Sequence, residues 1–406
     1  MKIVVNRAEL LSAAQDAQMV APDKSPLDVL ECAYLATEDG KLTVAAGNLE
    51  TSMERRIPVE IEEEGVTVIK ARLLAEMLRH LSEERVTIEQ KDNRRVEITC
   101  GESFYGFSTL DAATYPRLEI PFPGDTVTVK GLAGMAKRTV FAAAEESDKP
   151  QLKCVHLIFD ADGLRAVSSD SFRIAAAKGD SKSAGAVDML IPAASLEKAA
   201  RLVGDKGEVQ VGTTGKAVVF MKEDFIFSAR LVEGGYFDDT KMFAMAKTQF
   251  IVLSDAESLR RTMSSVYAVI GKQNRFSLSF DGNKLRMTCE SEYGASSVET
   301  EVVPLTGIPS GVFWYNPVKL LECFKALSGT LQLEVAQNGA LVMRTDELTC
   351  MQICMREPKP VERKVPKSVE AKAEKPEKKE KKAKETKAKG GTKRKKKEPA
   401  ELPNAA

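Results

Sequence analysis

The stretch KIVVNRAELLSAAQDAQMV, residues 2–20, contains the pattern from which most of the chain is built. Residues 2–6 alternate as a strand does, and residues 7–20 have the apolar spacing of a helix. The same order returns at residues 126–144 and 250–270, at intervals of about 124 residues. Repetition at a fixed interval predicts three copies of one structural unit.

A second predicted helix also recurs once in each copy. It begins at Ala71, Pro192 and Asn316, and each version carries apolar side chains along one face. Each second helix leads into two alternating segments joined by a polar turn, which is typical of a β-hairpin. The three turns are Asp92-Asn93, residues 212–215 and Asn338-Gly339. The predicted fold class is therefore α+β, with two helices plus antiparallel sheets in each unit.

Length and charge divide the chain further. The 406 residues are too many for one ordinary core, so we expect domains at 1–122, 123–246 and 247–357 and a tail at 358–406. The formal net charge is zero, but from residue 357 onward 18 Lys and Arg face 9 Asp and Glu. The body is therefore acidic and the tail basic.

The tail is rich in Lys, Glu, Pro and Ala and is expected to be disordered. Its basic cluster KRKKK, residues 393–397, suits DNA phosphates or an acidic partner. A purely solubilising tail explains the composition equally well. The tail also follows directly on residues 350–357, so it is placed to modulate access to a binding site formed there.

Several protein classes are disfavoured. No apolar run approaches the roughly 20 residues of a membrane helix, and MKIVVNRAEL becomes charged too early for a signal peptide, so a soluble cytoplasmic protein is expected. The seven cysteines are scattered and predicted to be structural thiols. Cys350 and Cys354 fall on one predicted strand, roughly 13 Å apart and too far for a shared metal or a disulfide.

The stretch VSSDSFRIAAA, residues 167–177, raises the question of catalysis. Ser168, Asp170 and Arg173 suit either a nucleophile with its acid and anchor or a turn between two strands. Similar strand–turn–strand segments occur in the other two copies, which favours the turn. His80 and His156 have no triad or metal spacing, and phosphate-binding glycine loops are absent from the sequence. We therefore predict no catalytic residues, no metal and no cofactor.

Four strings resemble the bacterial DNA polymerase III beta subunit (beta sliding clamp) family in order and spacing. They are FYGFSTLDAATYP at 104–116, SSDSFRIAAA at 168–177, FIFSARLVEGGYFDDTKMF at 225–243 and CMQICMRE at 350–357. The resemblance covers residues 1 to about 357. It implies a head-to-tail homodimeric ring with helices around a central hole and sheets outside.

The resemblance also implies the partners. Double-stranded DNA passes through the ring without sequence-specific contacts, and the ring confers processivity on the replicative polymerase. The DNA polymerase III alpha subunit, the clamp loader and repair polymerases bind through short linear motifs. The expected location is the cytoplasm, on the nucleoid, with no membrane partner.

The predicted lining helices carry positive charge suited to DNA phosphates, although a solvated helix face explains about half of these residues. Ala193 and Ala194 replace a basic pair that is frequent in the family, so contact there is expected to be weaker. The helices supply Arg72, Arg79, Lys137, Arg138, Lys198, Arg201, Arg260, Arg261, Lys319 and Lys325, and the resemblance adds Lys24, Lys149 and Lys153.

By the same resemblance, an apolar peptide-binding pocket lies between the second and third units. Ser171-Phe172 replaces the family's Gly-His, and Phe237 and Cys354 replace prolines, so either altered peptide preference or neutral drift is expected. The predicted pocket comprises Cys154, Ser169, Ser171, Phe172, Arg173, Ile174, Phe237, Lys241, Met242, Met351, Ile353, Cys354, Met355 and Arg356.

The family packs two regions across the joint between subunits. Tyr105 and Phe107 lie on a predicted edge strand, and Val269 and Ile270 end the third unit's first helix. Core packing within each unit is the alternative explanation for these four residues. Two rival functions remain open: an accessory clamp with altered partners, and an enzyme built on the same scaffold.

Overall fold

The computed structural model describes residues 1–92, 94–117, 120, 122–160, 163–179, 181–182, 187–204, 206–272 and 274–359. Asn93, in the first predicted turn, and the tail beyond Lys359 lie outside these residues. The disorder and the role of the tail therefore stay predictions.

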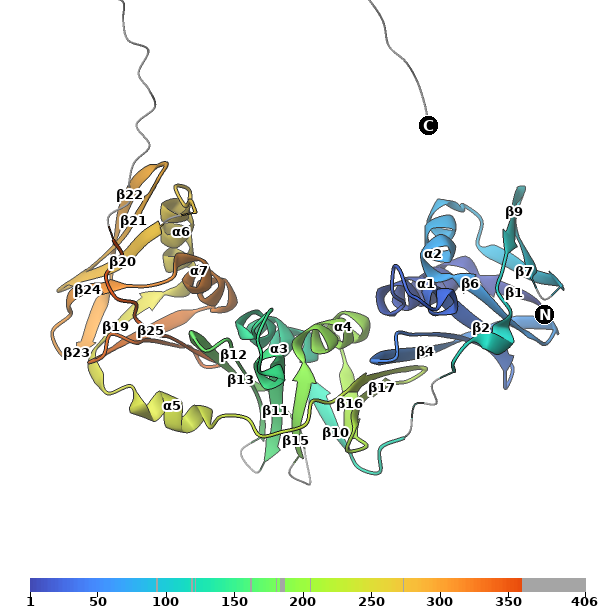
Figure 1. Cartoon of the computed structure of the whole chain (residues 1–406), viewed down its shortest axis with the longest axis horizontal. Coiled ribbons are helices and arrows are strands. Elements are labelled where there is room, and N and C mark those ends of the chain that lie inside the picture. Colours follow the sequence, from blue (N-terminus) through green and yellow to red (C-terminus); the bar gives the residue numbers. More distant parts are fainter. Residues whose placement is uncertain are drawn as a thin grey trace, which may run out of the picture. The chain divides into compact units, whose positions relative to one another are not determined.

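The first third of the chain follows the predicted order of strand, helix, strands, helix and strands (Figure 1). Its elements are β1 (Lys2–Asn6), α1 (Arg7–Val20), β2 (Cys32–Glu38), β3 (Lys41–Gly47), β4 (Thr51–Pro58), β5 (Glu60–Glu63), β6 (Val66–Lys70), α2 (Ala71–His80), β7 (Arg85–Asp92), β8 (Arg95–Cys100) and β9 (Ser103–Ser108).

The middle third repeats this order and ends in an additional short helix. Its elements are β10 (Thr126–Lys130), α3 (Leu132–Thr139), β11 (Cys154–Asp160), β12 (Gly163–Ser169), β13 (Arg173–Gly179), β14 (Ser181–Lys182), β15 (Val187–Pro192), α4 (Ala193–Val203), β16 (Glu208–Thr213), β17 (Ala217–Lys222), β18 (Phe225–Arg230) and α5 (Asp239–Met245).

The last third repeats the order again. Its elements are β19 (Thr248–Asp255), α6 (Ala256–Tyr267), β20 (Asn274–Asp281), β21 (Lys284–Ser291), β22 (Gly294–Glu301), β23 (Val303–Thr306), β24 (Ser310–Trp314), α7 (Pro317–Ala326), β25 (Thr330–Ala336), β26 (Leu341–Arg344) and β27 (Leu348–Gln352). β27 ends before Cys354, so the expectation that Cys350 and Cys354 share one strand is wrong.

Several helices begin directly after a polar residue whose side chain caps the first turn of the helix. The Asn6 side chain accepts hydrogen bonds from the backbone N–H groups of Ala8 and Glu9 at the start of α1. Asp255 caps α6 in the same way, and Asn316 caps α7 just before Pro317. These side chains satisfy amide groups that otherwise lack partners at a helix start.

The helices pack as pairs within each third of the chain. α1 lies against α2, α3 against α4 and α6 against α7 (Figure 1). Their apolar faces are buried in the main core together with one face of the sheets. The opposite, polar faces of the helices remain exposed, as the sequence periodicity predicts.

The strands form four antiparallel sheets. Sheet A has the order β5-β1-β7-β8-β9, and sheet D has the order β22-β21-β20-β24. Sheet B, β14-β10-β16-β17-β18-β4-β3-β2-β6, and sheet C, β15-β11-β12-β13-β27-β26-β25-β19-β23, each contain nine strands. β18 pairs with β4 and β13 pairs with β27, so strands from successive repeats join into continuous sheets.

Candidate functional site

The polar residues of the 167–177 stretch form a turn between β12 and β13. Ser168 Oγ is buried and donates to the Thr139 carbonyl at 2.6 Å, while Ser169 Oγ donates to the Arg173 carbonyl at 2.7 Å. Asp170 Oδ1 accepts from the backbone N–H groups of Phe172 and Arg173, at 3.0 Å each. These interactions support the interpretation of the stretch as a turn.

Arg173 was predicted to contact a bound peptide. Its guanidinium is instead buried and hydrogen-bonded within the protein. It donates to Asp170 Oδ2 at 3.1 Å, to Glu322 Oε2 at 2.5 Å and to the carbonyl oxygens of Phe141 and Lys319. Asp170 also pairs with the Lys319 ammonium. Arg173 therefore joins β13 to α7.

The other predicted pocket residues meet on one face of sheet C. Ile174 on β13 lies opposite Met351 on β27, and Met351 lies opposite Val342 on β26. These residues and Val167 form an apolar cluster, against which Tyr236, Phe237, Phe243, Ala176 and Ala246 pack. We call this cluster and its rim the groove.

The rim of the groove presents apolar side chains to solvent. Phe172, Ile353 and Met355 are 55%, 42% and 45% exposed, and the Ile353 N–H donates to the Phe172 carbonyl at 3.0 Å. The Lys319 ammonium lies 5.4 Å from the centre of the Phe172 ring. The remaining predicted rim residues that are at least partly exposed are Ser171, Lys241, Met242, Cys354 and Arg356.

Two predicted pocket residues are less accessible than expected. Cys154 is fully buried, and its burial raises the pKa of the thiol to about 11. Ser169 is also buried and serves the turn. Neither presents its side chain to an incoming peptide in this conformation, because both lie beneath the surface of the sheet.

Sequence reasoning missed several residues of the groove and its joint. Val167 and Val342 were predictable, because both are apolar residues on strands that the repeats predict. Tyr236 stacks on Phe237, with ring centres 4.4 Å apart, and its position depends on the chain path before α5. Glu322 reaches Arg173 across 149 residues of sequence, a separation that no local pattern indicates.

Exposed cations line the paired helices, as predicted for several positions. Arg72 on α2 and Lys137 on α3 are exposed, and the described residues offer neither an ion-pair partner. Lys24, Lys149 and Lys153 are exposed on loops or short turns, and Arg261 and Lys325 are exposed on α6 and α7. The structure thus leaves these groups accessible to phosphates.

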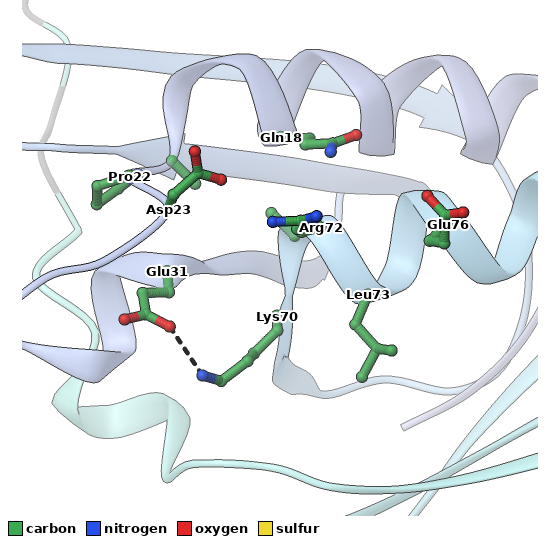
Figure 2. A pocket seen from close by; sticks show the side chains of 10 residues that line it. Gln18, Pro22, Asp23, Glu31, Lys70, Arg72, Leu73 and Glu76 are labelled. Atoms are coloured by element: carbon green, nitrogen blue, oxygen red, sulfur yellow. Dashed lines mark hydrogen bonds and ion pairs between the residues drawn. The ribbon is translucent and has the colours of Figure 1, made fainter. Parts of the chain in front are cut away.

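A hollow of about 600 Å³ lies between the end of α1 and the start of α2. Figure 2 shows Arg72 between Asp23 and Glu76 in this hollow, with Gln18 above it on α1. Lys70 Nζ donates to Glu31 Oε2 at 2.8 Å on the opposite wall. The hollow therefore combines both charge signs.

Other predicted DNA contacts are held by acidic partners. Arg138 pairs with Glu347 at 2.7 Å, and Lys319 pairs with Asp170. Both side chains were predicted to be available to DNA phosphates, whereas here each is held by a carboxylate. Arg79 pairs with Glu76, Arg201 with Glu197 and Arg260 with Glu257 along their own helices. Partial burial lowers the pKa of the Lys198 ammonium.

Two of the four predicted dimer residues lie on an outer strand, and the other two follow α6. β9, which carries Tyr105 and Phe107, is the last strand of sheet A, and both side chains pack against the core. Val269 and Ile270 follow α6, which ends at Tyr267, rather than ending the helix as expected. The Val269 carbonyl accepts a hydrogen bond from Ser291 Oγ at the end of β21.

Metal-binding clusters and membrane-spanning helices are both absent from the residues that the structure describes. No group of three or more His, Cys, Asp or Glu side chains is placed to hold a metal ion. Within the same residues, no helix is both long and apolar enough to cross a membrane.

Comparisons with known proteins agree along most of the chain. Residues 1–119 match the DNA polymerase III beta subunit N-terminal domain and residues 126–238 match its central domain, together more than half of the chain. The beta sliding clamp of Streptomyces coelicolor is 27% identical over 339 residues, covering 80% of this chain and 89% of the relative. That of Bacillus subtilis is 24% identical over 361 residues, covering 84% and 94%.

Solved structures show the same fold. The DNA polymerase sliding clamp of Bacillus subtilis superimposes with a TM-score of 0.81 at 20% identity, covering 88% of this chain and 100% of its own. The Pseudomonas aeruginosa sliding clamp bound to griselimycin gives 0.79 at 21% identity, covering 88% and 99%. The chain therefore belongs to the DNA polymerase III beta subunit family and has the fold of a sliding clamp.

Proposed function

We propose that two copies of this protein form a ring that encircles duplex DNA and tethers the replicative polymerase and other replication and repair proteins. Three features support this function: the unpaired outer strands β9 and β22, exposed cations on paired helices, and an apolar groove at a joint between repeats. The proposed domains are residues 1–122, 123–246 and 247–357.

The order of the strands in the four sheets is the main observation that supports the proposal. Sheets B and C each contain nine strands because strands of two successive repeats pair with each other. β18 pairs with β4 in sheet B, and β13 pairs with β27 in sheet C. Sheets A and D contain five and four strands and end at β9 and β22. β9 has the same place in its repeat as β18 and β27, and β22 has the same place as β4 and β13. Pairing of β9 with β22 of a second copy completes nine strands in the same order.

Two such joints, each between β9 of one copy and β22 of the other, close a head-to-tail dimer. Exposed strand edges are prone to pair with other chains, so a defined partner for β9 and β22 also removes this liability. Tyr105 and Phe107 on β9, and Val269 and Ile270 beside β22, are proposed to pack across each joint. Closed symmetric assemblies of this kind are common among soluble oligomers.

The helices are proposed to face DNA inside the ring. Arg72, Lys137 and the loop lysines attract the phosphate backbone without contacting bases, which suits sliding over any sequence. The acidic body limits binding of DNA to other surfaces. The protein is proposed to act in the cytoplasm on the nucleoid, without catalytic residues or a cofactor of its own.

The groove is proposed to bind short linear motifs of the DNA polymerase III alpha subunit, the clamp loader and repair polymerases. Motifs of this kind bind through a few anchored apolar side chains. Ile174 and Met351 supply an apolar floor, and Phe172, Ile353 and Met355 supply the rim. Methionine adapts to differently shaped partners, which suits a site shared by several proteins.

Retention on circular DNA tests the ring directly. The protein is loaded onto nicked circular plasmid with its clamp loader and ATP, washed in high salt, and the plasmid is then linearised. A topologically linked ring stays on the circle and is lost after cutting. Loss from the intact circle in high salt contradicts the proposal, because charge alone then held the protein.

A further inference from the structure

An exposed apolar surface lies at the edge of sheet C, away from the strands proposed to pair between copies. Val303 and Leu305 on β23 are 62% and 50% exposed. Val303 lies opposite Leu253 on β19, and Ile251, two residues before Leu253, lies opposite Thr306, so Val303, Leu253 and Ile251 share one face of the sheet. Leu305 lies in the bulge between these two pairs and is exposed there. We call Ile251, Leu253, Val303 and Leu305 the edge patch.

The equivalent strands of the other two repeats are polar. β5 has the sequence EIEE and β14 has the sequence SK, whereas β23 has the sequence VPLT. Charged residues on an edge strand usually protect it from unwanted contacts. The apolar sequence is therefore a property of the third repeat alone and does not follow from the shared fold.

The edge patch and the groove lie on the same face of the same sheet. Ile251 pairs with Glu334, Glu334 with Val342, Val342 with Met351, and Met351 with Ile174. Directly paired residues in a sheet point to the same side. The row thus begins in the edge patch and ends in the apolar cluster, four strand spacings or about 19 Å from β23 to β27.

The surface beside the edge patch is hollowed and polar. A cavity of about 620 Å³ is lined by Leu253 of the edge patch, by Gln332 and Arg344 on neighbouring strands, and by residues 328–330 and 345–347 at the strand ends. Arg344 Nε donates to Glu334 Oε1 at 2.6 Å, and its guanidinium lies 5.6 Å from the Phe243 ring at the groove. A chain crossing this surface therefore meets hydrogen-bonding groups between two apolar contacts.

We propose that the edge patch is a second docking surface for the DNA polymerase III alpha subunit already held in the groove. The occupant is an extended segment with apolar side chains separated by about six polar residues, the number that spans about 19 Å. Pro304 lacks an N–H and disfavours regular strand addition at β23, so the contact is through side chains. The inference rests on the proposed function of the groove.

Binding of the alpha subunit of the same organism tests this proposal. Overlapping alpha-subunit peptides of about fifteen residues first locate the segment that binds the wild-type protein. This segment is then trimmed to about five residues that still bind the groove, a length too short to reach the edge patch. The dissociation constants of this peptide and of the full alpha subunit are then measured for Val303→Ser/Leu305→Ser. The control is Leu27→Ser, which removes a leucine of similar exposure, 54%, outside the edge patch.

The expected result is that the double variant weakens the full alpha subunit about tenfold while the peptide changes less than twofold, because only the larger partner reaches both surfaces. Unchanged affinity for the alpha subunit overturns the edge patch as a docking surface. Equal weakening of both probes also overturns it, because the substitutions then act on the groove. Failure of both probes to bind the wild-type protein instead overturns the proposed groove function, and the inference with it.

Discussion

Asp170 Oδ2 accepts a hydrogen bond from Arg173 Nε at 3.1 Å, and both side chains are buried where the middle and last repeats meet. Arg173 also reaches Glu322 on α7, and Asp170 also pairs with Lys319 on α7. The turn that supports Phe172 is thereby fixed to a helix more than 140 residues away. The groove's rim depends on this ionic joint as much as on its apolar floor.

Arg173→Ala is expected to lower the free energy of unfolding by about 3 kcal/mol, because it leaves Asp170 and Glu322 without their shared cation. Urea denaturation of the wild type and the variant measures this change. Arg201→Ala is the matched control, because its pairing with Glu197 is exposed and contributes little. Equal, small effects of the two substitutions would contradict a structural role for Arg173.

Ser171 has a left-handed backbone with a φ of 72°, a conformation in which glycine is favoured. Ser171→Gly is therefore expected to raise the free energy of unfolding by about 0.5–1 kcal/mol. Ser103→Gly serves as the control, because the backbone of Ser103 is not left-handed and extra flexibility there destabilises. A lower unfolding midpoint in Ser171→Gly would show that the turn tolerates serine without strain.

The repeat in the sequence predicts the fold well because strand and helix periodicities are local. α1 begins at Arg7 and ends at Val20, as expected, since Asn6 caps it and its apolar spacing continues to Val20. α3 is shorter than its repeat suggests: it ends at Thr139 and gives way to a 3-10 turn. Thr139 Oγ1 bonds back to the Met135 carbonyl at that point.

The site was less predictable than the fold because it depends on contacts between distant segments. The resemblance pointed to Ile174 and Met351, which do pair across β13 and β27. It did not indicate that Arg173 and Lys319 pair with buried or partly buried carboxylates of the protein instead of contacting a peptide or DNA. Ion pairing of this kind depends on which helix end meets which turn, and sequence spacing carries no record of it.

Tyr105→Ala/Phe107→Ala is expected to shift the protein from dimer to monomer, because these side chains lie on the edge strand proposed to pair with β22 of the second copy. Sedimentation velocity over a range of concentrations measures the shift, and circular dichroism checks that the fold persists. Phe104→Ala is the control on the same strand, since Phe104 lies on the opposite face. A folded double variant that remains dimeric would exclude β9 as the joint.

Cys354 is expected to be the one thiol per chain that reacts quickly with a maleimide in the native protein, because the other six cysteines are buried. Burial raises the pKa of Cys32 and Cys154 to about 11, so few of these thiols are ionised near pH 7.5. Mass spectrometry of protein labelled for short times counts the adducts.

The label on Cys354 is also expected to weaken binding of an alpha-subunit peptide at least tenfold. Cys354 lies between the rim residues Ile353 and Met355 in the chain, and a bulky adduct on its partly buried thiol displaces them. Cys354→Ser treated in the same way supplies the control and should keep its affinity. Full peptide binding by the labelled wild type would place the peptide elsewhere.

Arg72→Glu/Lys137→Glu is expected to weaken salt-dependent binding to DNA without opening the ring. Each cation that contacts a phosphate contributes about 0.9 to the slope of log K against log salt, so loss of both lowers the slope by about 2 per chain. Fluorescence anisotropy with a short duplex at several salt concentrations measures the slope. Lys41→Glu is the control, because Lys41 lies on β3 and pairs with Asp224 in the turn before β18 rather than on the paired helices. Retention on closed circular DNA in high salt should be the same for all variants, because a topological link does not depend on these charges. An unchanged slope would mean that DNA does not meet this face of α2 and α3, whereas loss of retention would mean that the two residues maintain the ring itself.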